Sequence, residues 1–176
     1  MRMMSHSFKL APMSAGIRAI TIGVLLLPLI FGGWAIFSRD LLPVILALLI
    51  IAINAVVWFW CRPSRFLLRS DSLEILFPRW QRKILLTDIS GVEAIDHQTF
   101  CDRFGTAIRI GVGGLWGGFG WLWTSKRGLI EFYISQLDNL VLIQRCTGKS
   151  LLITPENPTE FCEILHSYCS SHSAQA

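Results

Sequence analysis

The chain has 176 residues, of which 52% are hydrophobic and 16% are charged, and its formal net charge is +4. The excess positive charge lies mostly before Arg62, because the part after Cys61 carries twelve Lys and Arg against eleven Asp and Glu. This balance argues against nucleic acid as a partner, since binding phosphates along a backbone requires a basic face.

Two apolar runs follow a short N-terminal segment. Residues 1–16 show no periodicity, and we expect a mobile cytoplasmic tail there. The runs Ala19–Phe37 and Leu41–Cys61 contain no charged residue, and only Ser38-Arg39-Asp40 separates them. Each run reaches the roughly 20 residues that a helix needs to cross about 30 Å of hydrocarbon. The pattern predicts a transmembrane helical hairpin over residues 17–61.

The charges beside the hairpin predict its orientation. Six basic residues flank the two runs: Arg2, Lys9, Arg18, Arg62, Arg65 and Arg69. The turn between the runs carries one Arg and one Asp, so the positive-inside rule predicts that both termini are cytoplasmic. A signal peptide is the alternative for the first run. That run is long for a signal peptide, has no small-x-small cleavage site and is followed at once by a second run.

Asn54 is the main polar residue of the second run. An amide inside the bilayer seeks a hydrogen-bond partner, either across the hairpin or in a second copy of the chain. Gly23, Gly32 and Gly33 would allow close helix approach, so a homo-oligomer is one of the partners to consider.

From Arg65 onward, short segments separated by turn residues are typical of a small antiparallel sheet. Seven strands are predicted, at residues 66–69, 73–77, 83–86, 92–95, 129–136, 140–146 and 150–154.

A terminal helix is predicted after the last strand. Asn157 is a good N-cap, Pro158 suits the first helical position, and Glu160 completes a capping-box pattern. The apolar residues that recur at helical spacing are Phe161, Ile164, Leu165 and Tyr168. This stripe should lie over an open end of the sheet.

The segment Gly111–Gly128 combines six glycines up to Gly120 with aromatic residues, which are followed by two basic residues. It is neither a dinucleotide fingerprint nor a P-loop, because Trp116 stands where a third glycine would fall and no Gly-Lys-Ser/Thr occurs. Two interpretations stay open: the aromatics pack the barrel, or they face the bilayer with the basic residues on headgroups. The candidate lipid- or partner-binding residues are Trp116, Phe119, Trp121, Trp123, Lys126 and Arg127.

Catalytic and metal-binding groups have weak support. Asp96-His97 and Cys101-Asp102 would supply a base and a nucleophile, but ordinary polar residues at a strand end explain them better. Cys162, His166 and Cys169 share one side of the terminal helix, yet the outer two lie about 10 Å apart along its axis.

The sequence therefore predicts no catalytic residue, no metal and no cofactor. The five cysteines form no CxxC pair, and we expect free thiols.

The order of seven strands and a closing helix is that of a pleckstrin-homology (PH) barrel. The run Leu140-Val141-Leu142-Ile143, Thr147-Gly148-Lys149 and Leu152-Ile153-Thr154-Pro155-Glu156-Asn157-Pro158 resembles the closing hairpin and helix of the bacterial PH domains. Arg103-Phe104-Gly105-Thr106 and Gly114–Phe119 resemble that family's central segment. The resemblance covers roughly Ser64 to Tyr168.

This resemblance implies an all-β PH-like barrel over 62–176, with a Gly/Trp-rich insertion near 103–128 and a C-terminal helix as a cap. It also implies a multi-pass protein of the bacterial inner membrane, because many members are small membrane proteins. In eukaryotic PH domains the first hairpin binds phosphoinositides through basic residues. Here Arg79, Arg82 and Lys83 lie near the second and third strands.

The function expected from these observations is that of a membrane-anchored, non-catalytic binding or scaffolding module. It would contact lipid headgroups or a protein partner at the cytoplasmic membrane face. The alternatives are a subunit of a membrane protein assembly and an enzyme with an unrecognised site.

Overall fold

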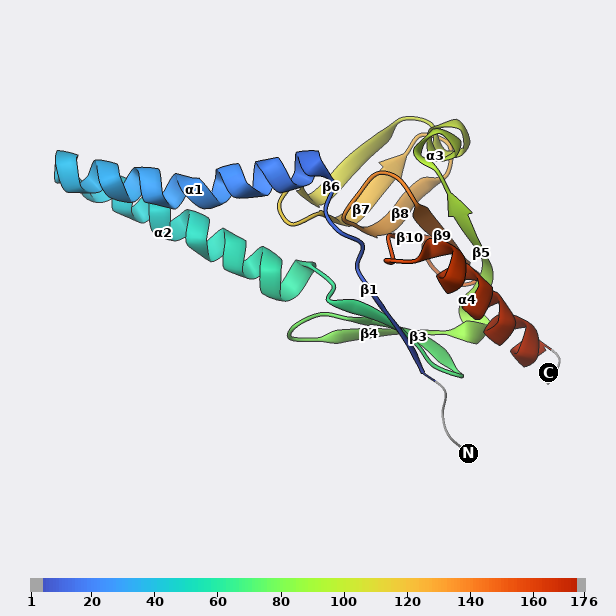
Figure 1. Ribbon diagram of the computed structural model, residues 1–176. Coiled ribbons are helices and arrows are strands. Elements are labelled where there is room, and N and C mark those ends of the chain that lie inside the picture. The colour runs from blue at the N-terminus through green and yellow to red at the C-terminus, as the bar shows by residue number, and fades with distance from the viewer. Residues whose placement is uncertain (1–4, 174–176) are drawn as a thin grey trace.

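The computed structural model describes residues 5–173. A long helical hairpin projects from one end of a β-rich domain, and a terminal helix lies on that domain (Figure 1). The helices are α1 (Ala15–Ser38), α2 (Leu41–Val56), α3 (His97–Phe104) and α4 (Pro158–Ser173). The predicted architecture of a helical hairpin, a β-barrel and a capping helix is confirmed.

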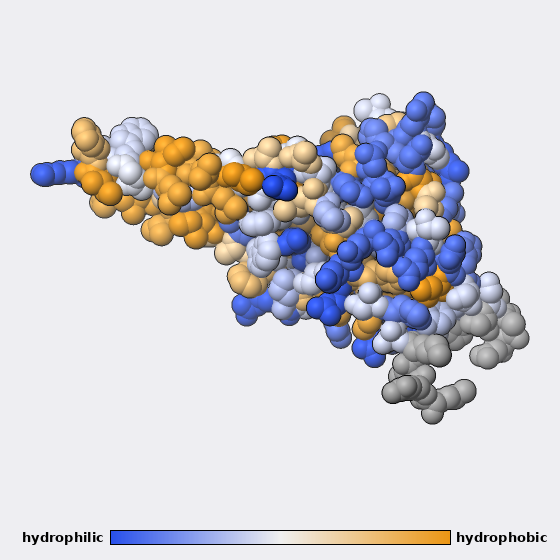
Figure 2. All heavy atoms as spheres, viewed as in Figure 1, coloured by the Kyte–Doolittle hydropathy of each residue, from blue (hydrophilic) through white to orange (hydrophobic). Residues whose placement is uncertain are grey.

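Both ends of the first helix of the hairpin are well defined. The Ser14 side chain caps α1, which ends at Arg39 in the left-handed conformation (φ 57°). α2 continues into a π-helical turn, Val57–Cys61. Both helices are long and apolar enough to cross a bilayer, and most of their large side chains are exposed on an apolar surface (Figure 2). A helix in a soluble core would bury such side chains.

Asn54 lies buried between the helices. Its Nδ2 donates to the carbonyl oxygen of Ile50 (2.9 Å) within the same helix, whereas its Oδ1 has no partner among the described residues. A Cβ added at Gly23, Gly32 or Gly33 would meet nothing within 4 Å, so these glycines are not sites of close helix contact inside the hairpin.

A strand precedes the hairpin, which corrects the expectation of a tail without structure. β1 (His6–Lys9) pairs antiparallel with β2 (Arg65–Leu68), and Phe8 is buried. The N–H of Ala11 then donates to the carbonyl oxygen of Thr154 (2.9 Å). The domain therefore begins before the helices and resumes after them. Residues 1–4 of the expected tail lie outside the described residues.

Ten strands form two sheets within the described residues. One sheet has the order β1-β2-β3-β4, and the other has the order β5-β9-β10-β8-β7-β6. The remaining strands are β3 (Ser72–Leu76), β4 (Gln81–Leu85), β5 (Ile89–Ile95), β6 (Ala107–Gly113), β7 (Gly118–Thr124), β8 (Gly128–Ile134), β9 (Leu140–Arg145) and β10 (Leu151–Ile153).

All seven predicted strands are present, but the sequence analysis missed β1, β6, β7 and the short helix α3. It also expected only antiparallel pairs. β10 lies between β8 and β9, antiparallel to β9 and parallel to β8, with Leu151 opposite Glu131. β8 and β9 run in opposite directions, so β10, which lies between them, must be parallel to one of them and antiparallel to the other.

The six-stranded sheet buries side chains on both faces. Along β9 the alternate residues Val141 and Ile143 face the four-stranded sheet, whereas Leu140 and Leu142 face α3. A strand with apolar residues on both faces reads as a continuous apolar run, and this explains the sequence Leu-Val-Leu-Ile.

The terminal helix closes the space between the sheets, as predicted. Phe161 and Leu165 have no exposed surface, and the Phe161 ring makes edge-to-face contacts with Phe8 (5.2 Å between centroids) and Phe66 (6.3 Å). The N-terminal strand, the first strand after the hairpin and the last helix therefore meet at one aromatic cluster.

We expect Phe161→Ala to lower the free energy of unfolding by about 3–5 kcal/mol, because the ring is fully buried. In a double-mutant cycle with Phe8→Ala, the pair should show a coupling of about 0.5–1.5 kcal/mol. Denaturant unfolding of the full chain in detergent, followed by tryptophan fluorescence, measures both values. Exposed Glu163→Ala on the same helix is the control. Strictly additive effects would mean that β1 is not docked on α4.

Candidate functional site

The candidate residues of the Gly/Trp segment lie on a two-stranded ribbon formed by β6 and β7. Gly111 lies opposite Gly120, with φ values of 139° and 131°. A Cβ at Gly111 would lie 2.4 Å from the carbonyl oxygen of Phe119, so the two backbones approach more closely than side chains allow. The residues on either side of this pair alternate between the two faces of the sheet.

Trp116 and Phe119 serve packing. Phe119 is buried in the core between the two sheets. Trp116 lies in the tight turn at the ribbon tip (φ 61°), and its backbone N–H donates to Thr21 Oγ1 in α1 (3.0 Å). Its ring contacts Trp58 of the π-helical turn at 4.5 Å. The ribbon tip is therefore fixed to both helices of the hairpin.

Trp121 and Trp123 are 47% exposed and lie on one face of the ribbon. Their cross-strand neighbours Ile110 and Ile108 are exposed as well. We call these four residues the exposed aromatic face. Cross-strand pairing brings these four apolar side chains together on one surface of the ribbon.

Lys126 and Arg127 lie in the turn between β7 and β8, at the end of the ribbon away from Trp116. Lys126 Nζ donates to the carbonyl oxygen of Asp102 (2.7 Å), and the Arg127 guanidinium lies over the Phe104 ring. A strand of seven residues spans about 20 Å. The structure thus divides the six candidates into a packed pair, an exposed pair and a distant basic pair.

A groove of about 390 Å³ separates the ribbon from the β3–β4 hairpin and the end of α2; we call it the aromatic groove. Trp60 and Trp80 form one wall, where Trp80 Nε1 donates to the carbonyl oxygen of Trp60 (3.0 Å). Ile110 and Trp121 belong to the opposite wall. The groove therefore joins the exposed aromatic face to the last turn of the hairpin.

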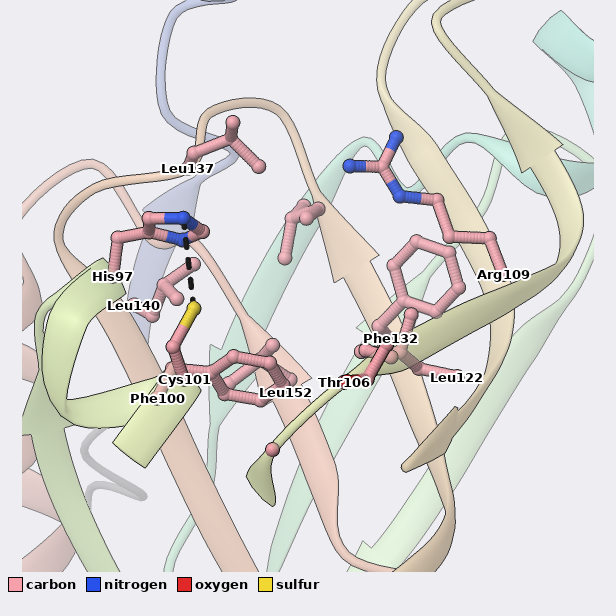
Figure 3. Close-up of a pocket in the computed structure, with 13 residues that line it drawn as sticks. His97, Phe100, Cys101, Thr106, Arg109, Leu122, Phe132, Leu137, Leu140 and Leu152 are labelled. Carbon is pink, nitrogen blue, oxygen red and sulfur yellow. Dashed lines mark hydrogen bonds between the residues drawn. The ribbon is translucent and has the colours of Figure 1, made fainter. Parts of the chain in front are cut away.

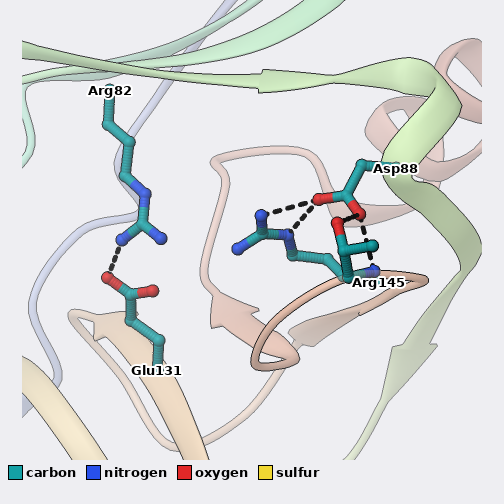
Figure 4. Close-up of polar contacts among 5 residues, drawn as sticks. Arg82, Asp88, Glu131 and Arg145 are labelled. Carbon is teal, nitrogen blue, oxygen red and sulfur yellow. Dashed lines mark hydrogen bonds and ion pairs between the residues drawn. The ribbon is translucent and has the colours of Figure 1, made fainter.

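A charged pair, Arg82 and Glu131, also lines this groove (Figure 4). Tyr133 donates its hydroxyl to the same Glu131 oxygen (2.7 Å). Burial, together with the bond to Glu131, raises the pKa of Tyr133 above its ordinary value, so the hydroxyl stays protonated. Arg82 and Tyr133 therefore share one oxygen of the buried carboxylate, Oε1.

The basic residues near the second and third predicted strands are engaged in contacts within the chain. Arg82 pairs with Glu131, Lys83 pairs with Asp71 (2.7 Å), and Arg79 lies over the Trp60 ring. Arg145 similarly pairs with Asp88 near the turn that joins β9 to β10 (Figure 4). Hydrogen bonds from Thr147, and then from Arg145, hold the pKa of Asp88 below its ordinary value.

Three basic residues gather instead where the hairpin joins the domain. Lys9 and Arg62 line two hollows of about 340 and 400 Å³, and Arg18 lines the second. We call this site the basic hollow. None of its three cations has an ion pair with a described residue, and Glu156 is the one carboxylate residue in its lining.

Arg62 is the most enclosed of the three. Its guanidinium lies 4.4 Å from the Trp58 ring centroid, and its buried Nε has no hydrogen-bond partner within the described residues. Burial lowers its pKa from the ordinary value. In the sequence these cations indicated membrane topology and contact with anionic headgroups, but not a shared site. Their convergence depends on β1, which the sequence analysis did not find.

The polar residues around α3 include those considered as a base and a nucleophile. Asp96 is the N-cap of α3 and accepts the N–H of Thr99 (2.7 Å), and this hydrogen bond lowers the pKa of Asp96. His97 Nε2 lies 3.7 Å from Cys101 Sγ at the rim of a pocket of about 260 Å³, the α3 pocket (Figure 3). Asp102 is exposed.

His166 and Cys162 of the terminal helix have different surroundings. His166 Nε2 lies 3.1 Å from the carbonyl oxygen of Val92, and burial raises the pKa of Cys162 to about 11. In the part of the chain that the structure describes, no three His, Cys, Asp or Glu residues are placed to hold a metal ion.

Comparison with known proteins agrees with the β-rich part of this architecture. The family model described as bacterial PH domain matches residues 64–168, from just before β2 into the last turns of α4. No curated protein and no solved structure matches the chain. The matched range is the one over which the sequence resemblance runs, and it covers more than half of the chain. The chain therefore belongs to the bacterial PH domain family.

Proposed function

We propose that this chain is a membrane-anchored, non-catalytic binding module that contacts anionic lipid headgroups at the cytoplasmic face of the bacterial inner membrane. The observation that carries this proposal is the basic hollow at the junction of hairpin and domain. PH domains as a class bind lipids or proteins, and this hollow favours lipid.

The charge distribution supports a headgroup ligand. Five cations of the domain have carboxylate partners: Arg69, Arg82, Lys83, Arg103 and Arg145. The three cations of the basic hollow have none, so their field is not neutralised within the described chain. Basic residues beside a membrane helix attract anionic lipids by about 1 kcal/mol each, and Arg suits a phosphate particularly well.

The position of the hollow also supports this ligand. It lies beside Arg18 in the first turn of α1 and beside Trp58 and Arg62 at the end of α2, where a bilayer surface would cross the hairpin. Indole rings prefer this level of the membrane. A headgroup in the hollow would therefore keep its acyl chains beside the apolar helices.

The exposed aromatic face would add apolar contact with the bilayer. It continues through the aromatic groove to Trp60, in the last turn of the hairpin. The turns of the β3–β4 and β6–β7 hairpins both point toward the helices (Figure 1). A protein partner would use the same surface, and labelling at Trp121 distinguishes the two.

Pairing of β1 with β2 favours a common side for the two ends of the hairpin, independently of charge. We expect a probe at Ser38→Cys to react with an impermeant thiol reagent from outside intact cells. A probe at Ser170→Cys should react only after the cells are opened. Both are made in a chain whose five native cysteines are replaced by Ser. Reactivity of Ser170→Cys from outside would contradict the cytoplasmic location.

We expect phosphatidylglycerol, but not phosphatidylcholine, to raise the Tm of the full chain in a non-ionic detergent. The triple change Lys9→Gln, Arg18→Gln and Arg62→Gln should abolish most of this increase, at about 1 kcal/mol of binding per charge. The matched control removes three ion-paired cations through Arg69→Gln, Lys83→Gln and Arg103→Gln. An equal loss in both triple variants would show that only net charge matters. A wild-type Tm that ignores the headgroup would overturn the proposal.

Replacing Trp121 by the photoreactive p-benzoylphenylalanine should give lipid adducts on illumination of native membranes. The same replacement at exposed Thr87 in the turn Leu86–Asp88 should not. Adducts with protein alone would favour partner recognition. As a folding comparison, Trp121→Ala with Trp123→Ala should destabilise the chain less than Phe119→Ala, which removes a buried ring and should cost about 3–5 kcal/mol.

A further inference from the structure

The α3 pocket lies on the opposite face of the six-stranded sheet from the aromatic groove. Along β7 and β8 the residues alternate, so Trp121 and Glu131 line the groove whereas Leu122 and Phe132 line the pocket. The pocket is therefore separated from the proposed lipid contacts by the thickness of the sheet, and its use does not depend on them.

The fold leaves this pocket open because α3 is too short to cover six strands. The helix has eight residues, capped by Asp96 and ended by Gly105 (φ 73°). Its Phe100 and Phe104 rings stack at 4.7 Å and cover only part of the face. Next to them, β6 and β7 carry four glycines at the positions that alternate with the exposed aromatic face: Gly111, Gly113, Gly118 and Gly120. These positions supply no side chain of their own, and the side chains of Phe132 and Arg109 lie over Gly118 and Gly113.

The inner wall of the pocket is apolar. Leu122, Phe132, Leu140 and Leu152 line it and are at most 6% exposed (Figure 3). The volume of about 260 Å³ is just below the range of about 300–1,000 Å³ that is typical of drug-sized ligands. The wall and the volume together suit the apolar body of a small molecule.

The mouth of the pocket is polar and carries a free cation. Figure 3 shows the guanidinium of Arg109 on one side of the opening and the ring of His97 on the other. Arg109 is exposed and forms no ion pair with any described residue. Its Nη1 lies 3.6 Å from where a Cβ of Gly113 would stand, so it extends along the glycine-lined part of the ribbon.

We infer that the α3 pocket binds a small amphipathic carboxylate. The apolar body lies against Phe132, Leu140 and Leu152, and the carboxylate lies at the mouth beside Arg109. A carboxylate matches the planar fork of a guanidinium with two parallel hydrogen bonds. The His97 ring lies on the opposite side of the mouth (Figure 3). The ligand is thus defined by one planar anionic end and a compact apolar body.

The test uses 3-phenylpropionate as the probe and the full chain in nanodiscs, with titration calorimetry as the readout. We expect saturable binding of one molecule per chain. The neutral analogue 3-phenylpropanol and the cation 3-phenylpropylamine should bind at least tenfold more weakly, because both lose the charge-assisted hydrogen bonds. Empty nanodiscs measure partitioning of each probe into lipid.

Variants then locate the site. Arg109→Gln should weaken 3-phenylpropionate binding at least tenfold, whereas the matched change Arg65→Gln, of an exposed strand arginine on the other sheet, should have no effect. Ala107→Phe should block the pocket from its edge. If that variant fails to fold, the exposed Arg109→Gln still decides the question.

Three outcomes would overturn the inference. The probe does not bind above the level of empty nanodiscs, the neutral analogue binds as tightly, or Arg109→Gln binds as well as the wild type.

Discussion

The pairing of β1 with β2 is the constraint on which the rest of the structure depends. The two strands flank the helical hairpin in sequence, so their antiparallel contact requires that the chain leave the domain and return to the same place. The linker after β1 is held as well, because Ser135 Oγ donates to the carbonyl oxygen of Ala11 (2.6 Å) and the N–H of Ser14 donates to that of Ser135 (3.0 Å). The helices are thus joined to the domain at both ends by ordered backbone.

This attachment determines where the basic hollow and the ribbon lie relative to the helices. Lys9, the last residue of β1, lies near Arg18 and Arg62. The ribbon tip contacts the hairpin through Thr21 and Trp58. One face of the six-stranded sheet lines the aromatic groove, and the other lines the α3 pocket. Along Trp121-Leu122-Trp123 the indoles face outward to the groove side, and the leucine faces the α3 pocket. One strand therefore contributes to two separate sites.

The parts that the sequence predicts well are those with a strong period or a strong cap. The apolar runs define the hairpin by length alone, and the Asn157-Pro158-Glu160 start defines α4, where Asn157 Nδ2 does donate to Glu160 Oε2 (3.1 Å). β1 was missed because it has four residues, of which only Phe8 is buried. Its partner strand lies beyond the hairpin, so no local pattern could reveal the pair.

The candidate site was only partly predictable for a related reason. Glycines break the alternation of β6 and β7, so the segment resembled an insertion instead of a regular hairpin. Lys126 and Arg127 follow Trp123 closely in sequence, yet the full length of β7 separates them from the ribbon tip at Trp116. The sequence did not indicate Arg109 as a candidate residue, because a single arginine in a strand does not reveal the pocket that it lines. Residues that are close in sequence can lie far apart when an extended strand separates them.

The placement of the hairpin inside the domain has a consequence for biosynthesis. β1 leaves the ribosome before the hairpin and β2, so the first sheet is completed only after both apolar helices have been made. Insertion of a single helix would leave β1 and β2 on opposite sides of the bilayer, with Phe8 unable to reach Phe66 and Phe161. In a bilayer, closure of this domain would therefore require both helices to cross together.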